Sequence, residues 1–342
     1  MQRKNYAGID GFRLIAAFMV IAIHTAPFSI VDDEIDYLLT YCLSRVAVPF
    51  FLMATGYFVL APYVFSGFEN KASLHRYLVK NTGLYLAATF LYLPLMIYSG
   101  NLPHTLPELI KTFLFDGTFY HLWYFPAAII GCNLLMLLAE KSMKAAVLFS
   151  AAAYIIGLFG DSYYGVVKDS PLFGPFYEEI FQISSYTRNG IFFAPVFLLL
   201  GMFLANKAFC CSRQNAWTGF LLSLFFMLME GYVTFRMDLQ KHNSMYLFLL
   251  PVMYFLFQLL LCVPGKMPVW LRSGSMLLYV IHPAVIVLLR AIAKAANQTT
   301  LFVQNTLVHY LCVCLLSSGI VFCIHRILER RIFYVSKRKS LD

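Results

Sequence analysis

Charged residues are scarce in this chain. Asp, Glu, Lys and Arg together make up 13% of its 342 residues, and tryptophan occurs only three times. Soluble domains carry about a quarter charged residues, so this shortage excludes an ordinary water-soluble fold. Apolar residues fill the difference: they reach 60%, including 33 Phe and 22 Tyr. A chain of this length has too little interior to bury so much apolar surface, which predicts an integral membrane protein.

Sequence signatures of several other protein classes are missing. We find no P-loop, no glycine-rich dinucleotide fingerprint and no repeat at a solenoid period. The eight cysteines fall in apolar segments or on the predicted cytoplasmic side, away from the outer loops where oxidation would pair them. Cys312 and Cys314 are two positions apart and would point in different directions on a helix. We therefore predict no disulfide scaffold, no metal site and no permanently bound cofactor.

Ten apolar segments are candidates for membrane spans: 9–29, 38–60, 81–99, 121–139, 145–160, 189–205, 216–235, 245–263, 275–292 and 305–325. A helix needs roughly 20 residues to cross a hydrocarbon core of about 30 Å. Segments 145–160 and 275–292 are the weakest candidates because both are short. The predicted fold is all-α, a polytopic membrane bundle of about ten transmembrane helices. Residues 1–325 would form the transmembrane domain, and 326–342 a basic cytoplasmic tail or linker.

Basic residues are distributed unevenly around these segments. With the N-terminus in the cytoplasm, the inner segments hold Arg3, Lys4, Lys71, Arg76, Lys80, Lys141, Lys144, Lys207, Arg213, Lys266, Arg272, Arg326, Arg330, Arg331, Lys337, Arg338 and Lys339. The outer segments hold only Lys111, Lys168, Arg236, Lys241 and Lys294. This positive-inside pattern predicts two cytoplasmic termini. The basic face suits anionic lipid of the inner leaflet, so the net charge of +9 requires no nucleic-acid partner.

The first apolar segment carries two ionisable residues at a suggestive spacing. Arg13 and His24 are eleven positions apart, which is three helical turns plus about 20°, so both would lie on one face about 16 Å apart along the axis. An arginine fork suits phosphate oxygens, and a neutral imidazole suits proton abstraction from a hydroxyl. The pair fits a bundle that takes an acyl thioester from the cytoplasm and presents its acyl group outward. The alternative is an interfacial arginine and a buried histidine bonded to a backbone carbonyl.

Three further ionisable residues lie in the last two apolar segments. Arg290 would lie at a helix end, where its side chain reaches the interface. His282 precedes Pro283 and either satisfies backbone groups freed by the proline or has a functional role. His309 fits a core or interface position.

Four stretches resemble the acyltransferase-3 family in the right order along nearly the whole chain. They are residues 8–17 (GIDGFRLIAA) leading to His24, 45–58 (RVAVPFFLMATGYF), 121–126 (HLWYFP) and 275–283 (SMLLYVIHP). Many members have Ser where this chain has Thr55. The resemblance implies a ten-helix protein of the bacterial plasma membrane that moves acyl groups onto envelope acceptors. It also implies that His24 is the catalytic residue and Arg13 its partner, with acyl-CoA as co-substrate.

A second, closer resemblance is to the membrane domain of VanT-type serine racemases of vancomycin resistance. It rests on residues 160–162 (GDS), 187–193 (TRNGIFF) and 241–249 (KHNSMYLFL). In that family the membrane domain precedes a cytoplasmic pyridoxal-phosphate racemase and is thought to supply L-serine. The resemblance implies that this chain is the membrane part alone, that a cytoplasmic racemase domain is its partner, and that it has no racemase activity by itself.

Two functional classes therefore remain open, acyl transfer and serine uptake or delivery. The candidate substrate-binding residues map to the outer half or outer loops and are Arg188, Asp161, Glu230, His242, Arg45 and His121. Arg188 would bind the carboxylate of serine, and Asp161 or Glu230 its ammonium group. A cell-envelope acceptor with hydroxyls could use the same groups, and loop-ordering ion pairs are the remaining alternative. The expected partners are membrane lipid and a small-molecule substrate.

Overall fold

A computed structural model describes residues 6–268 and 270–339, with side chains described as far as residue 328. Among these residues no β-strand occurs. Seven helical segments are long and apolar enough to cross a membrane: Ala7–Thr25, Asp33–Phe65, Ala72–Ser99, Tyr124–Lys141, Arg213–Arg236, Trp270–Ala295 and Thr306–Leu328. Three shorter apolar helices are Met143–Phe159, Ala194–Leu204 and Leu249–Leu261. These ten segments match the ten predicted spans and confirm a polytopic all-α membrane protein; the orientation stays a prediction.

The described chain falls into two compact units, and each is described by itself. The terminal unit combines Met1–Thr40 with Val263–Asp342, and the central unit is Tyr41–Cys262. The predicted boundary at residue 326 lies within one continuous helix, α15 (Thr306–Lys339). Residues 340–342 of the predicted tail, and its side chains from residue 329 onward, lie outside the described part.

Three helices build the terminal unit: α1 (Ala7–Thr25), α14 (Trp270–Ala295) and α15. Its core contains the buried side chains Ile21, Val285 and Val313, one from each helix. The first predicted span is too long at its C-terminal end. Helix α1 stops at Thr25 because Ala26 adopts a left-handed conformation with φ of 46°. The short α2 (Asp33–Asp36) and η6 (Thr300–Gln304) complete the unit.

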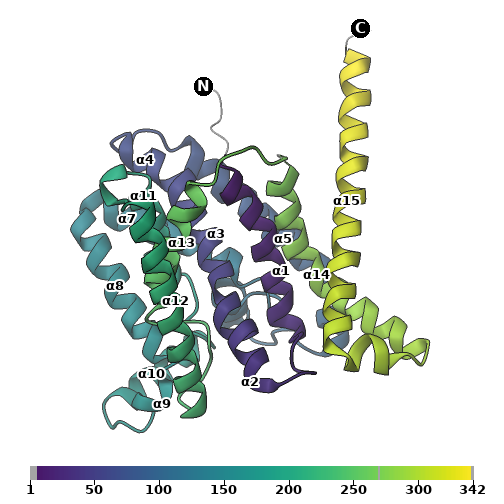
Figure 1. Cartoon of the computed structure of the whole chain (residues 1–342), viewed down its shortest axis with the longest axis horizontal. Helices are drawn as coiled ribbons and strands as arrows, with labels where there is room; N and C mark the ends of the chain where they lie inside the picture. Colours follow the sequence, from purple (N-terminus) through teal and green to yellow (C-terminus); the bar gives the residue numbers. More distant parts are fainter. Residues whose placement is uncertain (1–5, 269, 340–342) are drawn as a thin grey trace. The chain divides into compact units, whose positions relative to one another are not determined.

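The central unit contains the remaining helices. Figure 1 shows five of them packed alongside one another, namely α7, α8, α11, α12 and α13. In chain order the helices of this unit are η2 (Leu43–Val46), α3 (Ala47–Thr55), η3 (Gly56–Leu60), α4 (Ala61–Phe65), α5 (Ala72–Ser99), α6 (Leu106–Lys111), η4 (Thr112–Asp116), α7 (Tyr124–Lys141), α8 (Met143–Phe159), α9 (Tyr164–Val167), α10 (Phe173–Ile183), α11 (Ala194–Leu204), η5 (Lys207–Phe209), α12 (Arg213–Arg236) and α13 (Leu249–Leu261). The π-helix η1 (Tyr37–Cys42) joins the two units in sequence.

Two glycines allow the backbones of the central unit to touch. A Cβ atom on Gly56 would lie 2.0 Å from the carbonyl oxygen of Leu198, and one on Gly201 would lie 2.1 Å from that of Met53. Small residues at such crossings let membrane helices pack at close range without a hydrophobic driving force. The segment α3–η3 and helix α11 therefore form the closely packed centre of this unit.

Two predicted spans begin too early. Segment 189–205 becomes helical only at Ala194, and segment 245–263 only at Leu249. The residues before each helix form turns instead, because polar side chains hydrogen-bond their backbone. Asn189 Oδ1, for example, accepts from the amides of Ile191 and Phe192. Irregular backbone inside a membrane protein is tolerated where it is buried in protein or lines a cavity. Helices α8, α11 and α13 thus leave room for a cluster of polar turns at their ends.

Candidate functional site

The first half of α1 holds a buried carboxylate between two arginines of the terminal unit. Arg272 donates to both oxygens of Asp10, from Nε at 2.8 Å and from Nη2 at 2.7 Å. Arg13 Nε lies 3.7 Å from Asp10 Oδ1. A bidentate pair is the strongest arginine–carboxylate geometry, so Asp10 and Arg272 are fixed relative to each other. The result is a cluster with a formal charge of +1 that includes the first residue of the predicted Arg13–His24 pair.

The predicted pair lies on one unbroken helix, since α1 includes both residues. His24 is half-buried near the C-terminal end of α1 and stacks on His282 of α14, with ring centroids 5.4 Å apart and planes 22° apart. His282 is fully buried, and its Nδ1 lies 3.1 Å from the carbonyl oxygen of Leu278. The terminal unit therefore holds two cations near one end of α1 and two imidazoles near the other.

Asp161 is the centre of a separate polar cluster in the central unit. It follows the end of α8, is fully buried, and accepts with Oδ1 from the amides of Ser244 and Met245 at 2.7 and 2.9 Å and from the Ser162 hydroxyl at 3.0 Å. Burial alone would raise the pKa of Asp161, but its hydrogen bond to His242 and other neighbouring interactions hold the pKa below its usual range. Asp161 is therefore an ionised carboxylate that organises the turn before α13.

His242 connects the charged residues of this cluster. Its Nδ1 lies 2.8 Å from Ser244 Oγ and 3.5 Å from Asp161 Oδ2. Burial lowers the pKa of His242 to about 4, and the positive charges of Arg188 and Arg45 also lower it, against the opposing effect of Asp161. His242 is thus neutral at physiological pH. One carboxylate and two guanidinium groups then give the cluster a net positive charge that favours an anionic ligand group.

Arg188 is enclosed by aromatic rings. Its guanidinium carbon lies 5.0 Å from the centroid of the Trp123 ring and 4.5 Å from that of Tyr186. Tyr186 also contacts His242 edge-on, with centroids 4.8 Å apart. Such cation–π contacts fix the plane of the guanidinium group. The turn 184–193 presents Arg188 because Asn189 bonds the backbone on both sides of it, at Tyr186 and at Ile191.

Arg45 reaches the same cluster from η2. It is buried, its guanidinium group lies 5.6 Å from the ring of Tyr41, and its Nη2 donates to Asn243 Oδ1. The structure thus brings together four of the six predicted substrate-binding residues: Arg188, Asp161, His242 and Arg45.

The other two predicted residues have different surroundings. Both oxygens of Glu230 serve the protein itself: Oε1 accepts from the Tyr163 hydroxyl and the Leu247 amide, and Oε2 accepts from the Phe248 amide. Glu230 therefore secures the entry into α13. His121 is buried among the rings of Tyr92, Phe119 and Tyr120. Ligand binding by either residue stays a prediction, and in residues 121–126 it is the Trp123 ring that contacts Arg188.

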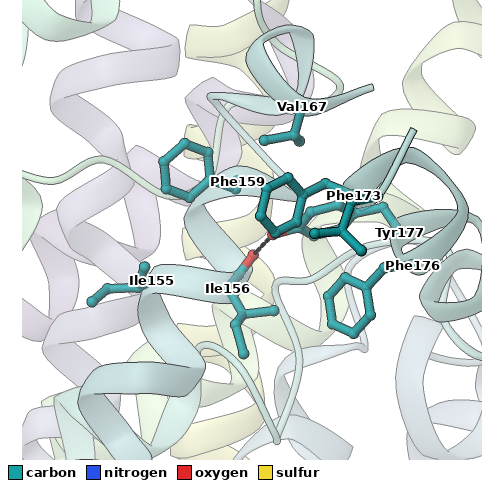
Figure 2. Close-up of a pocket in the computed structure, with 8 residues that line it drawn as sticks. Ile155, Ile156, Phe159, Val167, Phe173, Phe176 and Tyr177 are labelled. Carbon is teal, nitrogen blue, oxygen red and sulfur yellow. Dashed lines mark hydrogen bonds between the residues drawn. The ribbon is translucent and has the colours of Figure 1, made fainter. Parts of the chain in front are cut away.

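An apolar groove of about 630 Å³ lies between the end of α8 and the segment α9–α10. Figure 2 shows its lining side chains, among them Ile155, Phe159, Phe173 and Phe176, and the hydrogen bond from the Tyr177 hydroxyl to the Ile156 carbonyl. Because the lining is almost wholly apolar, the groove offers none of the charged groups that a polar substrate requires. In this respect the groove differs from the two polar clusters described above.

Sequence reasoning misses several residues of both sites. In the terminal unit, Arg272 is predicted to lie in an inner loop but is found in the first turns of α14. The sequence also does not decide whether His282 has a structural or a functional role. In the central unit the missed residues are Trp123, Tyr186, Asn243 and Ser244. Most belong to the motif stretches noted in the sequence, so the signal was present, but neither spacing nor composition says which member of a stretch points into a site.

This chain is similar to one protein family and to several curated proteins. The acyltransferase domain family matches residues 6–326. An amino-acid racemase of Enterococcus faecalis is 41% identical over 323 residues, which cover 92% of this chain and 44% of the relative. A serine/alanine racemase of Enterococcus gallinarum is 39% identical over 326 residues, covering 92% and 45%. The chain thus spans less than half the length of these curated relatives. No solved structure matches it.

The two resemblances noted in the sequence are confirmed. The family match runs through all ten apolar helices and includes Arg13, His24 and the central cluster. The alignment with the racemases covers nearly all of this chain, consistent with a shared membrane domain. The chain belongs to the acyltransferase-3 family of multi-pass membrane proteins.

Proposed function

We propose that this protein transfers an acyl group from a cytoplasmic acyl-CoA to an outward-facing hydroxyl or amino acceptor at the bacterial plasma membrane. The observation that carries the proposal is the arrangement along α1, with Arg13 beside the Asp10–Arg272 pair near one end and His24 stacked on His282 near the other. A guanidinium cluster suits the phosphates of coenzyme A, and an imidazole suits the reacting carbonyl and hydroxyl.

The reaction assigns one role to each end of α1. Neutral His24 accepts the proton of the acceptor hydroxyl as the oxygen attacks the thioester carbonyl. The new bond joins the acceptor oxygen to the acyl carbon, the carbon–sulfur bond breaks, and the imidazolium returns its proton to the departing thiolate. Arg13 holds the donor phosphates and so keeps the thioester within reach. No metal or permanently bound cofactor takes part in this scheme.

The test measures release of the coenzyme A thiol by the purified chain in proteoliposomes supplied with acetyl-CoA and a candidate envelope acceptor. His24→Ala and His24→Gln should each lower turnover about 10²–10⁴-fold, because neither side chain takes a proton as imidazole does. Arg13→Ala should raise the concentration of acetyl-CoA that is needed. Arg290→Ala changes an exposed arginine of α14 and serves as the control. Full turnover in His24→Gln would exclude general-base catalysis by His24.

A second candidate function is binding and delivery of L-serine by the central unit. The observation that favours it is the cluster itself, in which the Arg188 guanidinium group contacts the rings of Trp123 and Tyr186 while the ionised Asp161 lies beside His242. The cation would hold the serine carboxylate and the anion its ammonium group. One relative is named a serine/alanine racemase. A cytoplasmic racemase domain would then be the partner that receives the amino acid.

Uptake of labelled L-serine, measured in the same proteoliposomes, separates the two candidates. The serine function predicts uptake that survives His24→Gln and fails when Asp161 is replaced by Asn. The acyl-transfer function predicts thiol release that fails with His24→Gln. A protein that takes up serine with both Arg13→Ala and His24→Gln in place, and releases no thiol, would leave serine delivery as the function.

A further inference from the structure

The ring of His282 is held by contacts from its own helix and from α1. His282 is fully buried and precedes Pro283 inside α14, where proline has no backbone N–H to donate. Its ring contacts two others, that of His24 at 5.4 Å and that of Tyr279 at 6.2 Å. A histidine that merely filled the helix interior would not need a near-parallel partner ring from another helix.

One ring nitrogen of His282 is anchored. Its Nδ1 lies 3.1 Å from the carbonyl oxygen of Leu278, and a carbonyl oxygen only accepts. Nδ1 therefore carries hydrogen, which fixes the tautomer and the orientation of the ring. In metal and protease sites, the group bonded to the second nitrogen of a histidine plays this same orienting part. Here the anchored ring is the one that His24 lies against.

We infer that His282 is a positioning residue that holds the imidazole plane of His24 by stacking, with Leu278 as its own anchor. The inference rests on the proposed acyl transfer, because it deepens the role of His24 in that reaction. His24 is half-buried at the end of α1, where the helix gives way to the left-handed Ala26. The buried, anchored ring of His282 lies nearly parallel to the His24 ring at this end of the helix and would restrict its plane.

Three substitutions separate stacking from anchoring. His282→Phe keeps an aromatic ring against His24 and loses the bond to Leu278. His282→Asn keeps a donor near the position of Nδ1 and loses the ring. His282→Ala loses both. His309→Ala is the matched control, since His309 is also buried in the terminal unit with Nδ1 bonded to a backbone carbonyl, that of Phe302 at 2.7 Å.

The first readout does not depend on acyl transfer. Diethyl pyrocarbonate modifies neutral imidazoles, and peptide mass spectrometry gives the modification rate of His24 in each variant of the full chain. A stacked ring contributes about 0.5–1.5 kcal/mol, so we expect a rate about threefold to tenfold higher in His282→Ala and His282→Asn. His282→Phe and His309→Ala should stay near the wild type. Equal rates in all variants would overturn the inference.

The second readout is the split between kcat and KM for thiol release from acetyl-CoA. Misplacing a catalytic group by about 1 Å costs on the order of 10²-fold, so kcat should fall by that amount in His282→Asn while KM changes little. His282→Phe should recover most of kcat. A Phe variant as inactive as the Asn variant would show that a stacked ring is not enough to position His24, and the inference would be wrong.

The two readouts keep the two proposals apart. If the wild type releases no thiol while His24 modification follows the predicted order, acyl transfer fails and the positioning of His24 stands. If thiol release depends on His24 and is unaffected by every His282 substitution, acyl transfer stands and the positioning role falls.

Discussion

The two polar sites of this protein are held in different ways. In the terminal unit the candidate functional side chains project from helices: Asp10, Arg13 and His24 from α1, and Arg272 and His282 from α14. In the central unit they lie on or beside the turns at the ends of short helices. The first arrangement orders side chains on backbone that is already hydrogen-bonded. In the second arrangement, side chains form the hydrogen bonds to backbone amides that lie outside any helix.

This difference predicts that substitutions at the two sites will have unequal effects on stability. Removing a polar side chain from α1 should leave the helix in place and change what the site does. Removing one from the turns should release backbone amides inside the protein, where unmade hydrogen bonds are costly. The predictions that follow test this contrast, beginning with the largest expected effect.

Asp161→Ala and Asp10→Ala compare two buried carboxylates directly. Asp161→Ala removes the acceptor of two backbone amides and a charge close to Arg45, which should destabilise the protein by about 3–5 kcal/mol. Asp10→Ala should cost about 1–3 kcal/mol, because α1 keeps its own hydrogen bonds. Thermal unfolding in detergent measures both. A larger loss for Asp10→Ala would contradict the contrast between helix-held and turn-held sites.

Acid should destabilise the central unit through His242. Its pKa is about 4 in the folded protein against an ordinary value of 6.5. As the pH falls below 6.5, the unfolded chain binds this proton first, so stability should be lost between about pH 6.5 and pH 4, by about 1–3 kcal/mol in total. Well above pH 7 the residue is neutral in both states and contributes no pH dependence.

His242→Gln is the control for this pH effect. The substitution removes the titrating group and should flatten the dependence of melting temperature on pH between 7 and 4.5. A slope that persists unchanged in His242→Gln would assign the acid sensitivity to other groups.

Gly201→Ala tests the close packing of α11 on α3. The new Cβ atom would meet the backbone oxygen of Met53 at 2.1 Å, so the helices must separate, at a cost of about 1–3 kcal/mol. Gly83→Ala in α5 is the matched control, because a Cβ atom there meets nothing within 4 Å. Alanine is the better helix former, so Gly83→Ala should be neutral or stabilising. Equal melting temperatures for both variants would contradict the packing argument.

Arg188→Lys tests the central site without changing its charge. Lysine keeps the positive charge but loses the planar fork and most of the contact with Trp123 and Tyr186. If the central unit binds serine as proposed, its affinity should fall at least about tenfold, which corresponds to about 1.4 kcal/mol, with unchanged expression. Isothermal titration in detergent measures the affinity. Unchanged affinity would favour a purely loop-ordering role for Arg188.

The same contrast explains which parts of the two sites could be predicted from the sequence. The Arg13–His24 spacing could be predicted because both residues lie on one regular helix with a known rotation per residue. Asp161 and His242 are 81 positions apart and meet only because two turns fold against each other. Their proximity could be suspected from their shared outer location, but their contact could not be derived. Likewise the start of α11 at Ala194 depends on the hydrogen bonds of Asn189, which hydropathy does not register.

Glu230 shows the limit of reasoning from residue type. An acidic residue inside an apolar segment is costly, and the sequence therefore indicates a functional site. In the structure its two oxygens accept from two backbone amides and the Tyr163 hydroxyl. The cost of burial is offset by groups that the sequence gives no means of identifying in advance.

The position of Trp123 makes its fluorescence a probe of the central site. The chain contains three tryptophans, and the indole of Trp123 lies against the guanidinium group of Arg188, whereas Trp217 is largely exposed on α12 and Trp270 stacks on His325. Indole emission responds to nearby charge and to solvent. With Trp217 and Trp270 replaced by Phe, the remaining tryptophan fluorescence would come from Trp123 in the central site alone. The protein thus carries an intrinsic reporter at the residue where we propose that a carboxylate binds, and no attached dye is needed to observe it.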